Sequence, residues 1–291
     1  MKKLVFAVLA CVFTSAAMGE EVNRTVNAQS DGHVSVSNVA GEVEVEGWAK
    51  NTVQVTGKLG RNVKELIVES DGDEVVVKVK LPHNSHGGGD ANLKIMVPAG
   101  SSVDIGAVSA NIEVSGVRGE QSLHTVSGNV RTEFFGNDIE AESVSGDVSV
   151  KGDRSAGEVR AATVSGSVVV DGVSGEVRAE SVSGDVTIED GIITSAGMET
   201  VNGDIHFEAE FRGDDRLVAD TVNGSVRITF IGGVSAEFSI ETFNGSIRNC
   251  FGPKAERTSK YTPGWELEFT EGDGAGEVVV STMNGSVRIC K

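Results

Sequence analysis

Hydrophobic and polar residues alternate along most of this chain, and the alternation returns in units of 18 to 21 residues. One unit contains the phrase TVNGSVRI at 221–228, and near-copies such as TVNGDIHF, SVSGDVTI and TVSGSVVV recur along the chain. Val, Ile and Thr dominate these phrases, proline is scarce, and we find no helical period. The pattern therefore predicts short β-strands throughout.

A glycine marks each copy of the phrase and gives the repeat its spacing. The eight aligned glycines are Gly128, Gly146, Gly166, Gly184, Gly203, Gly224, Gly245 and Gly285. Their successive separations are 18, 20, 18, 19, 21, 21 and 40 residues, and looser copies begin at Ala107 and Asn38. A period near 20 that tolerates small slips is typical of a solenoid, in which each repeat packs only against its neighbours.

Each repeat supplies two strands that meet at a Ser-Gly or Asn-Gly corner. In most repeats, apolar residues occupy the positions seven and five before the glycine and two and four after it. One unit cannot bury this apolar face alone, but stacked units pair in register at ~4.8 Å and share a core. We therefore predict an all-β, single-stranded β-helix (β-solenoid) with rungs of 18–21 residues. We expect glycine at the corner because it tolerates positive φ.

The residue before each glycine forms a predicted corner ladder that changes from serine to asparagine along the chain. Its members are Ser127, Ser145, Ser165, Ser183, Asn202, Asn223, Asn244 and Asn284. Stacked asparagine amides hydrogen-bond along a cross-β stack, although either residue also simply suits a corner. Neither interpretation implies a binding site. The Thr-Val or Ser-Val pair before the corner leaves open which side chain is buried, since neighbours on a strand face opposite ways.

The repeated phrases resemble the bacterial "putative adhesin" family, a domain of unknown function whose members carry serial ETVNGDI phrases. The resemblance covers nearly all of the chain after residue 19, including the stretches GHVSVSNVAGEVEVEGW and NLKIMVPAGSSVDIGAVSANIEVSGVRG and the closing GWELEFTEGDGAGEVVVSTMNGSVRI. It implies a right-handed β-helix and an adhesin-like role, with no catalytic residues to transfer. The motifs are structural, so the resemblance is specific for fold and weak for function.

The chain divides into three predicted parts. Residues 1–19 have the three-part pattern of a signal peptide: a positively charged start, a short apolar run and small residues before the cleavage site. A lipoprotein reading, with Cys11 as the lipidated residue, is the alternative. Residues 20–99 form an irregular N-terminal β segment or cap, and residues 100–291 form the repeats, with an inserted loop at 251–265. We expect export to the periplasm, the cell surface or the medium.

Two cysteines outside the leader fix the register of the last repeat. Cys250 and Cys290 each lie five residues after a corner glycine. On adjacent rungs they would be ~4.8 Å apart, inside the usual range for a disulfide, whereas two rungs would exceed it. We predict a Cys250–Cys290 disulfide, with two free thiols as the alternative. The chain ends at Lys291, so we expect an open terminal strand that permits end-to-end self-association unless the inserted loop covers it.

Charge narrows the range of partners. The formal net charge of −18 favours solubility and opposes binding to nucleic acid, and we expect no transmembrane segment. Two columns of acidic residues admit calcium as an alternative to a solvated outer face: Asp147, Asp185 and Asp204, and Glu142, Glu180, Glu199, Asp220 and Glu241. We expect the second interpretation, with these acidic residues paired to Arg227, Arg248 and Arg288 around the corner. His83, His86 and Asp90 resemble a metal site only loosely, so we expect no metal and no cofactor.

Catalytic motifs of the GxSxG, HExxH or phosphate-loop type are absent from the sequence. The sequence therefore predicts a non-catalytic exported β-solenoid, an adhesin-like envelope or surface protein whose ligand is a protein or a glycan. One alternative is a polysaccharide-active β-helix enzyme, although aromatic residues make up only 5% of the chain. Another alternative is a self-assembling envelope scaffold.

Overall fold

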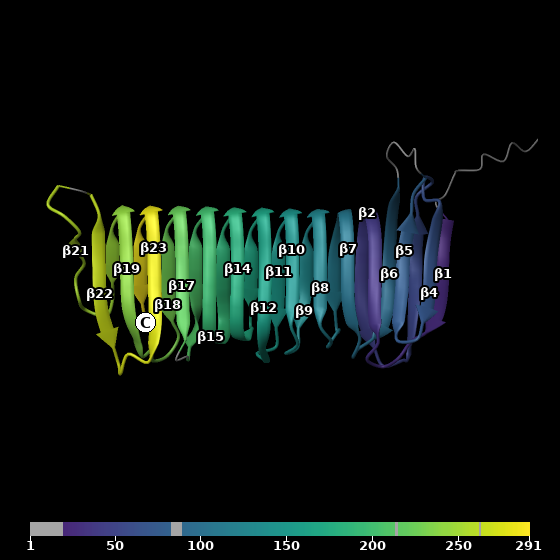
Figure 1. The fold of residues 1–291 in the computed structure, drawn as a ribbon, viewed down its shortest axis with the longest axis horizontal. Coiled ribbons are helices and arrows are strands. Elements are labelled where there is room, and N and C mark those ends of the chain that lie inside the picture. Colours follow the sequence, from purple (N-terminus) through teal and green to yellow (C-terminus); the bar gives the residue numbers. More distant parts are fainter. Residues whose placement is uncertain (1–19, 83–88, 213–214, 262) are drawn as a thin grey trace, which may run out of the picture.

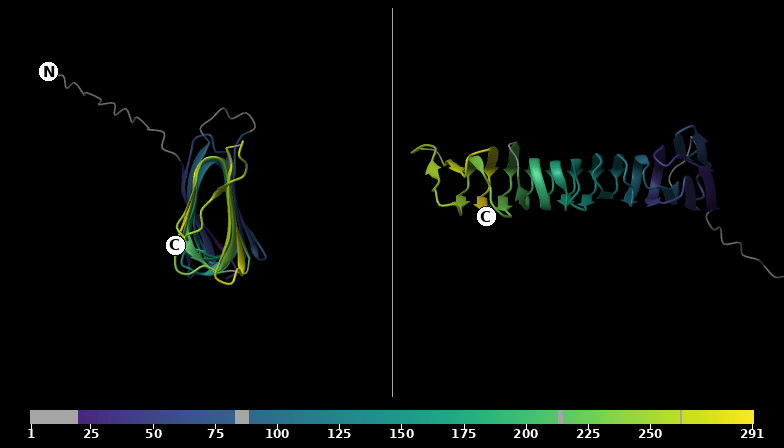
Figure 2. Two further views of the ribbon diagram at one scale, coloured as in Figure 1. Left: turned by 90° about the vertical axis from the view of Figure 1, so that its left-hand side faces the viewer. Right: turned by 90° about the horizontal axis from the view of Figure 1, so that it is seen from below.

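The computed structural model describes residues 20–82, 89–212, 215–261 and 263–291, and these residues form strands, turns and loops without a helix. The all-β prediction is confirmed. Figure 1 shows the strands side by side in one long row, and the end-on view in Figure 2 shows each rung as a flattened loop. Two layers of strands thus face each other across a narrow core. In the described part of the chain, no helix is long and apolar enough to cross a membrane. The leader and the Cys11 alternative lie outside the described residues.

The front layer contains the strands that run toward the corner, and neighbours in it are parallel. In spatial order, its strands are β7 (Ser102–Ser115), β8 (Gln121–Ser127), β10 (Ile139–Ser145), β12 (Ala156–Ser165), β14 (Ser174–Ser183), β15 (Val186–Asn202), β17 (Arg216–Asn223), β23 (Gly276–Asn284) and β19 (Ala236–Asn244). Two of these, β7 and β15, are long enough to belong to both layers.

The back layer contains the strands that leave the corner, again with parallel neighbours. Its strands are β9 (Val130–Phe134), β11 (Val148–Gly152), β13 (Val168–Asp171), β16 (Ile205–Phe211), β18 (Val226–Phe230), β24 (Val287–Cys290) and β20 (Ile247–Asn249). Val148 lies opposite Val130 on one side and Val168 on the other, which reproduces the sequence spacing of the repeat. Alternate residues of both layers point inward, and the side chains of Val148, Val168 and their equivalents are fully buried, except for Ile247 of β20, which is partly buried.

The N-terminal end of the stack mixes parallel and antiparallel pairs. Its strands are β1 (Glu20–Asn27), β2 (His33–Trp48), β3 (Thr52–Leu59), β4 (Glu65–Asp71), β5 (Glu74–Lys80) and β6 (Asp90–Pro98). The long strand β2 pairs with β7 on one side and with β5 and β6 on the other, all in parallel. Antiparallel strands then close the end: β3 and β1 extend from β6, and β4 pairs with β5. Lys94 joins β6 to β2, and hydrogen bonds to Glu44 and Glu46 raise the pKa of Lys94 to about 12.

The C-terminal end departs from sequence order. Strand β23 lies between β17 and β19, and β24 lies between β18 and β20, so the last repeat of the chain is inserted between two earlier ones. Figure 1 shows yellow β23 between the green strands β17 and β19. The prediction of an open strand edge at Lys291 is therefore wrong. Short β21 (Glu256–Arg257) and β22 (Trp265–Glu271) form the actual end, with β22 antiparallel to β19.

Aromatic side chains fill the core beneath this end. Phe269 of β22 stacks on Phe238 of β19 with ring centroids 4.4 Å apart, and Phe251 contacts both rings. The predicted Cys250–Cys290 disulfide is confirmed, with the two Cα atoms 4.8 Å apart; Cys290 ends β24, and Cys250 directly follows the neighbouring strand β20. Packed aromatic side chains and a disulfide therefore hold the end of the solenoid-like stack together.

The corner glycines have a different role from the one expected. Gly146, with φ of 159°, is the single corner glycine with positive φ, and its backbone is close to fully extended. The requirement is space: a Cβ atom placed on any of the eight corner glycines would lie 1.8–2.2 Å from the backbone oxygen of the neighbouring rung. Glycine is needed here because successive corners approach too closely for any side chain.

Candidate binding groove

The Thr-Val or Ser-Val pair before each corner turns its hydroxyl residue inward and its valine outward. The inward residues form a hydroxyl column that is at least 95% buried: Thr125, Ser143, Thr163, Ser181, Thr200, Thr221, Thr282 and Thr242. Each hydroxyl donates a hydrogen bond to the carbonyl oxygen of the corner residue on the preceding rung, which is a glycine in every case but one; Thr163 Oγ1, for example, lies 2.8 Å from the Gly146 oxygen. The column thus satisfies backbone oxygens that the turn removes from the strand ladder.

Two single substitutions, one at the buried and one at the exposed member of the same pair, test this role. We expect Thr163→Val to destabilise the protein by about 1–3 kcal/mol, because it leaves the Gly146 oxygen buried without a donor. The control Val164→Thr changes the neighbouring exposed residue and should stay within about 0.5 kcal/mol of wild type. Urea unfolding followed by circular dichroism measures both. Equal stability of the two variants would show that the buried hydroxyl is not required.

The outward residues form a valine column, an exposed apolar stripe that crosses nine rungs. In spatial order it consists of Val108, Val126, Val144, Val164, Val182, Val201, Val222, Met283 and Phe243, whose side chains are 39–55% exposed. Neighbouring rungs are ~4.8 Å apart, so these side chains are continuous with one another. Single exposed apolar residues are common on protein surfaces, but a contiguous exposed apolar patch is typical of an interaction site. The sequence carried the signal, since an apolar residue follows each Thr or Ser, but the pair alone does not say which member is exposed.

A long groove runs beside the valine column on the front layer. It has a volume of about 1100 Å³ and extends from Val39 through Val108 to Val222. These eight rungs cover about 34 Å at the spacing of paired strands. The floor is formed by the hydroxyl column, and the wall opposite the valines is formed by the residues four before each corner glycine, among them His124, Glu142 and Asp220.

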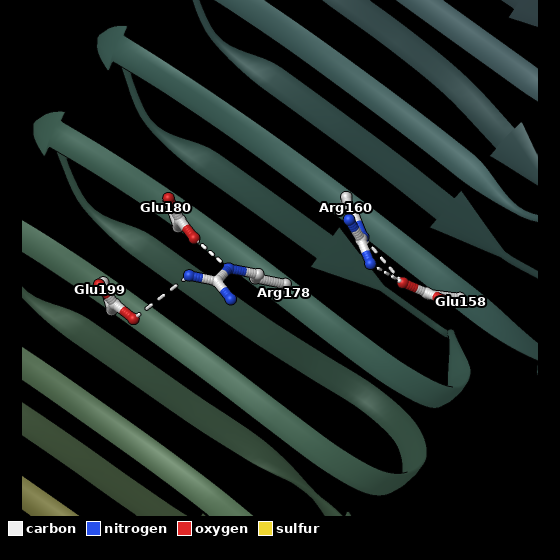
Figure 3. Close-up of polar contacts among 5 residues, drawn as sticks. All are labelled: Glu158, Arg160, Arg178, Glu180 and Glu199. Carbon is white, nitrogen blue, oxygen red and sulfur yellow. Dashed lines mark hydrogen bonds and ion pairs between the residues drawn. The ribbon is translucent and has the colours of Figure 1, made fainter.

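Carboxylates give the groove its charge. Glu142 contacts His124 at 3.2 Å, and Asp220 accepts a hydrogen bond of 2.7 Å from the Ser281 hydroxyl. Farther along the wall, Arg178 lies between Glu180 and Glu199 just outside the groove, while Arg160 pairs with Glu158 (Figure 3).

The hydrogen bond from Arg178 to Glu180, supported by the charge of that carboxylate, raises the pKa of Arg178 above its ordinary value. Arg178 therefore offsets charge near the middle of the groove. The carboxylates of Glu142 and Asp220, which form no ion pair with an arginine among the described residues, remain as accessible anionic groups at either side of it.

The corner ladder residues occupy one column on the edge between the two layers. Ser127, Ser145, Ser165 and Ser183 lie opposite one another on successive front strands. The four asparagines follow in the order Asn202, Asn223, Asn284 and Asn244, and each amide nitrogen donates to the previous amide oxygen at 2.9 Å. Their order in space differs from the order in the chain because of the inserted last rung.

The acidic residues after the corner have structural partners. The side-chain oxygens of Asp147, Asp185 and Asp204 each accept a hydrogen bond from the backbone N–H of the next rung at 2.7–2.9 Å. Within the described ranges, no three His, Cys, Asp or Glu residues are arranged to hold a metal ion. His83 and His86 lie outside these ranges, and Asp90 begins β6.

The expected pairing of these acidic residues with Arg227, Arg248 and Arg288 is wrong. None of the three takes part in an ion pair among the described residues. Backbone amides, rather than guanidinium groups, occupy the nearby carboxylates.

The parallel stacked rungs, the buried hydroxyl column at the corners and the long groove on the front layer define this chain as a β-solenoid-like repeat protein with an exposed apolar groove. Its sequence matches the family described as Toastrack DUF4097 over residues 22–290, and the chain belongs to that family. The resemblance seen in the sequence to a domain of unknown function is thereby confirmed. Comparison with curated proteins gives no match.

Several solved structures are similar to the chain at low sequence identity. A "putative adhesin" from Bacteroides fragilis is 9% identical with a TM-score of 0.44, and the alignment covers 93% of this chain and 97% of that one. A "putative lipid binding protein" from Parabacteroides distasonis is 13% identical with a TM-score of 0.46, covering 94% and 98%. A "putative adhesin" from Parabacteroides merdae is 11% identical with a TM-score of 0.39, covering 94% and 97%.

Proposed function

We propose that this chain is a non-catalytic, exported, adhesin-like protein of the cell envelope or surface that docks a partner protein in the groove beside the valine column. The observation that carries the proposal is the valine column itself, an apolar stripe left exposed along the groove. The Cys250–Cys290 disulfide supports an oxidising compartment, as export requires. A right-handed winding of the stack is part of the proposal and agrees with the general handedness of parallel β-crossovers.

The polar groups of the groove select a cationic partner. The hydroxyl column has no hydrogen left to donate to a ligand, because each hydroxyl donates its hydrogen to a corner carbonyl oxygen. Glu142 and Asp220 are therefore the polar groups best placed to contact a ligand. A second copy of the same groove would bring carboxylates against carboxylates, which is unfavourable. A partner with lysine or arginine beside an apolar face has the complementary charge.

The backbone of the groove selects a helix. Front-layer strands such as β10 and β14 are paired on both sides, so the groove offers no free strand edge to an extended peptide. An extended segment would press unsatisfied backbone N–H and C=O groups against valines, whereas a helix satisfies its own. An amphipathic helix of about 22 residues, rising 1.5 Å per residue, spans about 33 Å, close to the length of the groove. We therefore infer a cationic amphipathic helix as the occupant.

Synthetic peptides test this function directly. The probe is a 22-residue amphipathic peptide of leucine and lysine, compared with a scrambled isomer and with a leucine–glutamate counterpart, in fluorescence anisotropy with the purified protein. We expect the leucine–lysine helix to bind and the other two to bind at least ten-fold more weakly. The triple variant Val126→Thr, Val144→Thr, Val182→Thr keeps side-chain shape and should weaken binding about fifty-fold, because each of the three lost methyl groups contributes about 0.8 kcal/mol.

A pair of charge variants separates groove recognition from general electrostatics. Glu142→Gln with Asp220→Asn removes two carboxylates from the groove, and Asp171→Asn with Glu189→Gln removes two from the back layer. We expect only the first pair to weaken binding. Equal binding of the scrambled peptide, or an unchanged affinity of the valine variant, would overturn the groove as the docking surface. If the two double variants lose the same affinity for the peptide, the interaction depends only on the net charge of the protein.

A further inference from the structure

Three copies of the sequence Asn-Gly-Ser-x-Arg lie side by side where the front layer turns into the back layer. They lie at 223–227, 244–248 and 284–288, separated by 21 and 40 residues in the chain. Because β24 is inserted between β18 and β20, Arg288 lies opposite Arg227 on one side and Arg248 on the other. The topology thus builds an arginine column, Arg227–Arg288–Arg248, that is continuous only in space.

Among the described residues, the arginines of this column have no ion-pair partner. Elsewhere, Arg154, Arg160, Arg178, Arg212 and Arg216 each contact a carboxylate. The three arginines of the column are exposed and form none of the ion pairs in the described part of the chain. Arginine is always protonated, and like charges on neighbouring strands repel one another. The free protein therefore concentrates positive charge that a bound anion would relieve.

Hydrogen-bond donors flank the arginine column. In these three rungs the position after the glycine is Ser225, Ser286 or Ser246, where the rungs of Gly146, Gly184 and Gly203 carry aspartate. The negative group is replaced by a hydroxyl beside each arginine, and Ser246 and Ser286 are 3.2 Å apart. Beyond the serines, the amides of Asn223, Asn284 and Asn244 each use one hydrogen within the ladder and keep a second for a ligand.

We propose that the arginine column, with its flanking serines and asparagines, binds a linear acidic polysaccharide through that polymer's carboxylate or sulfate groups. Guanidinium groups bind such oxyanions in a bidentate manner, and serine and asparagine side chains suit sugar hydroxyls. Three identical sets of donors on successive rungs favour a repeating polymer over a single small anion, because linked groups bind with a high effective concentration. The net charge of −18 opposes polyanions at long range, but the Debye length is ~8 Å at physiological salt, so local groups decide. This site is on the opposite layer from the groove and does not depend on it.

Binding measurements with defined polymers test the proposal. The probes are polygalacturonate for carboxylates, dextran sulfate for sulfates, uncharged dextran, and inorganic sulfate alone, each titrated with the full-length purified protein by biolayer interferometry at physiological salt. We expect at least one charged polymer to bind while dextran does not, and which one binds identifies the anionic group. The triple variant Arg227→Gln, Arg288→Gln, Arg248→Gln should lose at least ten-fold in affinity.

A second triple variant keeps this test independent of net charge. Arg154→Gln, Arg160→Gln, Arg216→Gln removes the same charge from paired positions and should change affinity less than two-fold. Arginine-to-lysine changes at all three column positions should give an intermediate affinity, because lysine lacks the bidentate geometry. If neither charged polymer binds, or if the two glutamine variants lose the same affinity, the proposed site is wrong. Displacement of the polymer by inorganic sulfate at equal charge concentration would overturn its preference for a polymer.

Discussion

Gly184→Ala should lower the melting temperature of the protein by about 10 °C, although alanine is ordinarily the better residue in a strand. A Cβ at this position would lie 1.9 Å from the Gly166 oxygen, and that oxygen also accepts the Ser181 hydroxyl at 2.9 Å. The corner must move away from its neighbour, which breaks this hydrogen bond and separates two rungs in the middle of the stack. Overpacking together with a lost buried hydrogen bond costs about 3–5 kcal/mol. Thermal unfolding followed by circular dichroism measures the shift.

Gly106→Ala is the matched control for the corner variant. Gly106 lies in β7 of the same layer, and a Cβ there would have no atom within 4 Å. This variant should leave the melting temperature unchanged or raise it slightly. The added free energy of unfolding should not exceed about 1 kcal/mol. If both variants unfold at the wild-type temperature, the corners are not held by close backbone contact and the glycine is conserved in the repeat for another reason.

The repeat made the local architecture readable from the sequence. The strict alternation around each glycine placed Val148, Val168 and their equivalents in the core, where the structure has them. The equal distance of Cys250 and Cys290 from their glycines predicted the disulfide, because identical positions in stacked repeats become neighbours. Both inferences need only a period, and a period is a property that a single sequence displays.

The order of the last rungs could not be obtained in the same way. Strand β19 has the same corner phrase as β17 and β23, so it fits equally well beside either of them in sequence terms. The separations of 21 and 40 residues suggested that Gly245 follows Gly224, but the neighbour of both is Gly285. Equivalent repeats do not encode which copy stacks on which, and the choice depends on how the connecting segment 250–275 packs.

Both candidate surfaces depend on features that the pattern left open. The groove exists because threonine, and not valine, turns inward to satisfy a corner oxygen, as Thr221 does for Gly203. The arginine column exists because the inserted rung places Arg288 between Arg227 and Arg248. Alternation determines that neighbours face opposite ways without determining which faces the core, so the side chains that a ligand meets follow from tertiary structure.

Cys250→Ser with Cys290→Ser should destabilise the protein by about 4 kcal/mol, the chain-entropy value for a disulfide that closes a loop of 40 residues. The effect should be concentrated at the C-terminal end. The rung of β23 and β24 reaches its place between two earlier rungs only after the chain has passed through β21 and β22, and the disulfide holds β24 against β20. Urea unfolding followed by circular dichroism measures the loss of stability, and tryptophan fluorescence adds a signal from this end, where Trp265 begins β22, together with one from Trp48 in β2.

Reducing agent provides the control for the disulfide variant. Reduced wild-type protein should unfold at the same urea concentration as the double serine variant, and the variant itself should not respond to reduction. Hydrogen exchange should then show faster exchange in β20 and β24, while β10 and β12 in the middle of the stack keep their protection, since repeats are stabilised mainly by their neighbours. Loss of protection along the whole stack would show that the inserted rung is required for the fold as a whole, and unchanged stability would show that strand pairing alone holds it in place.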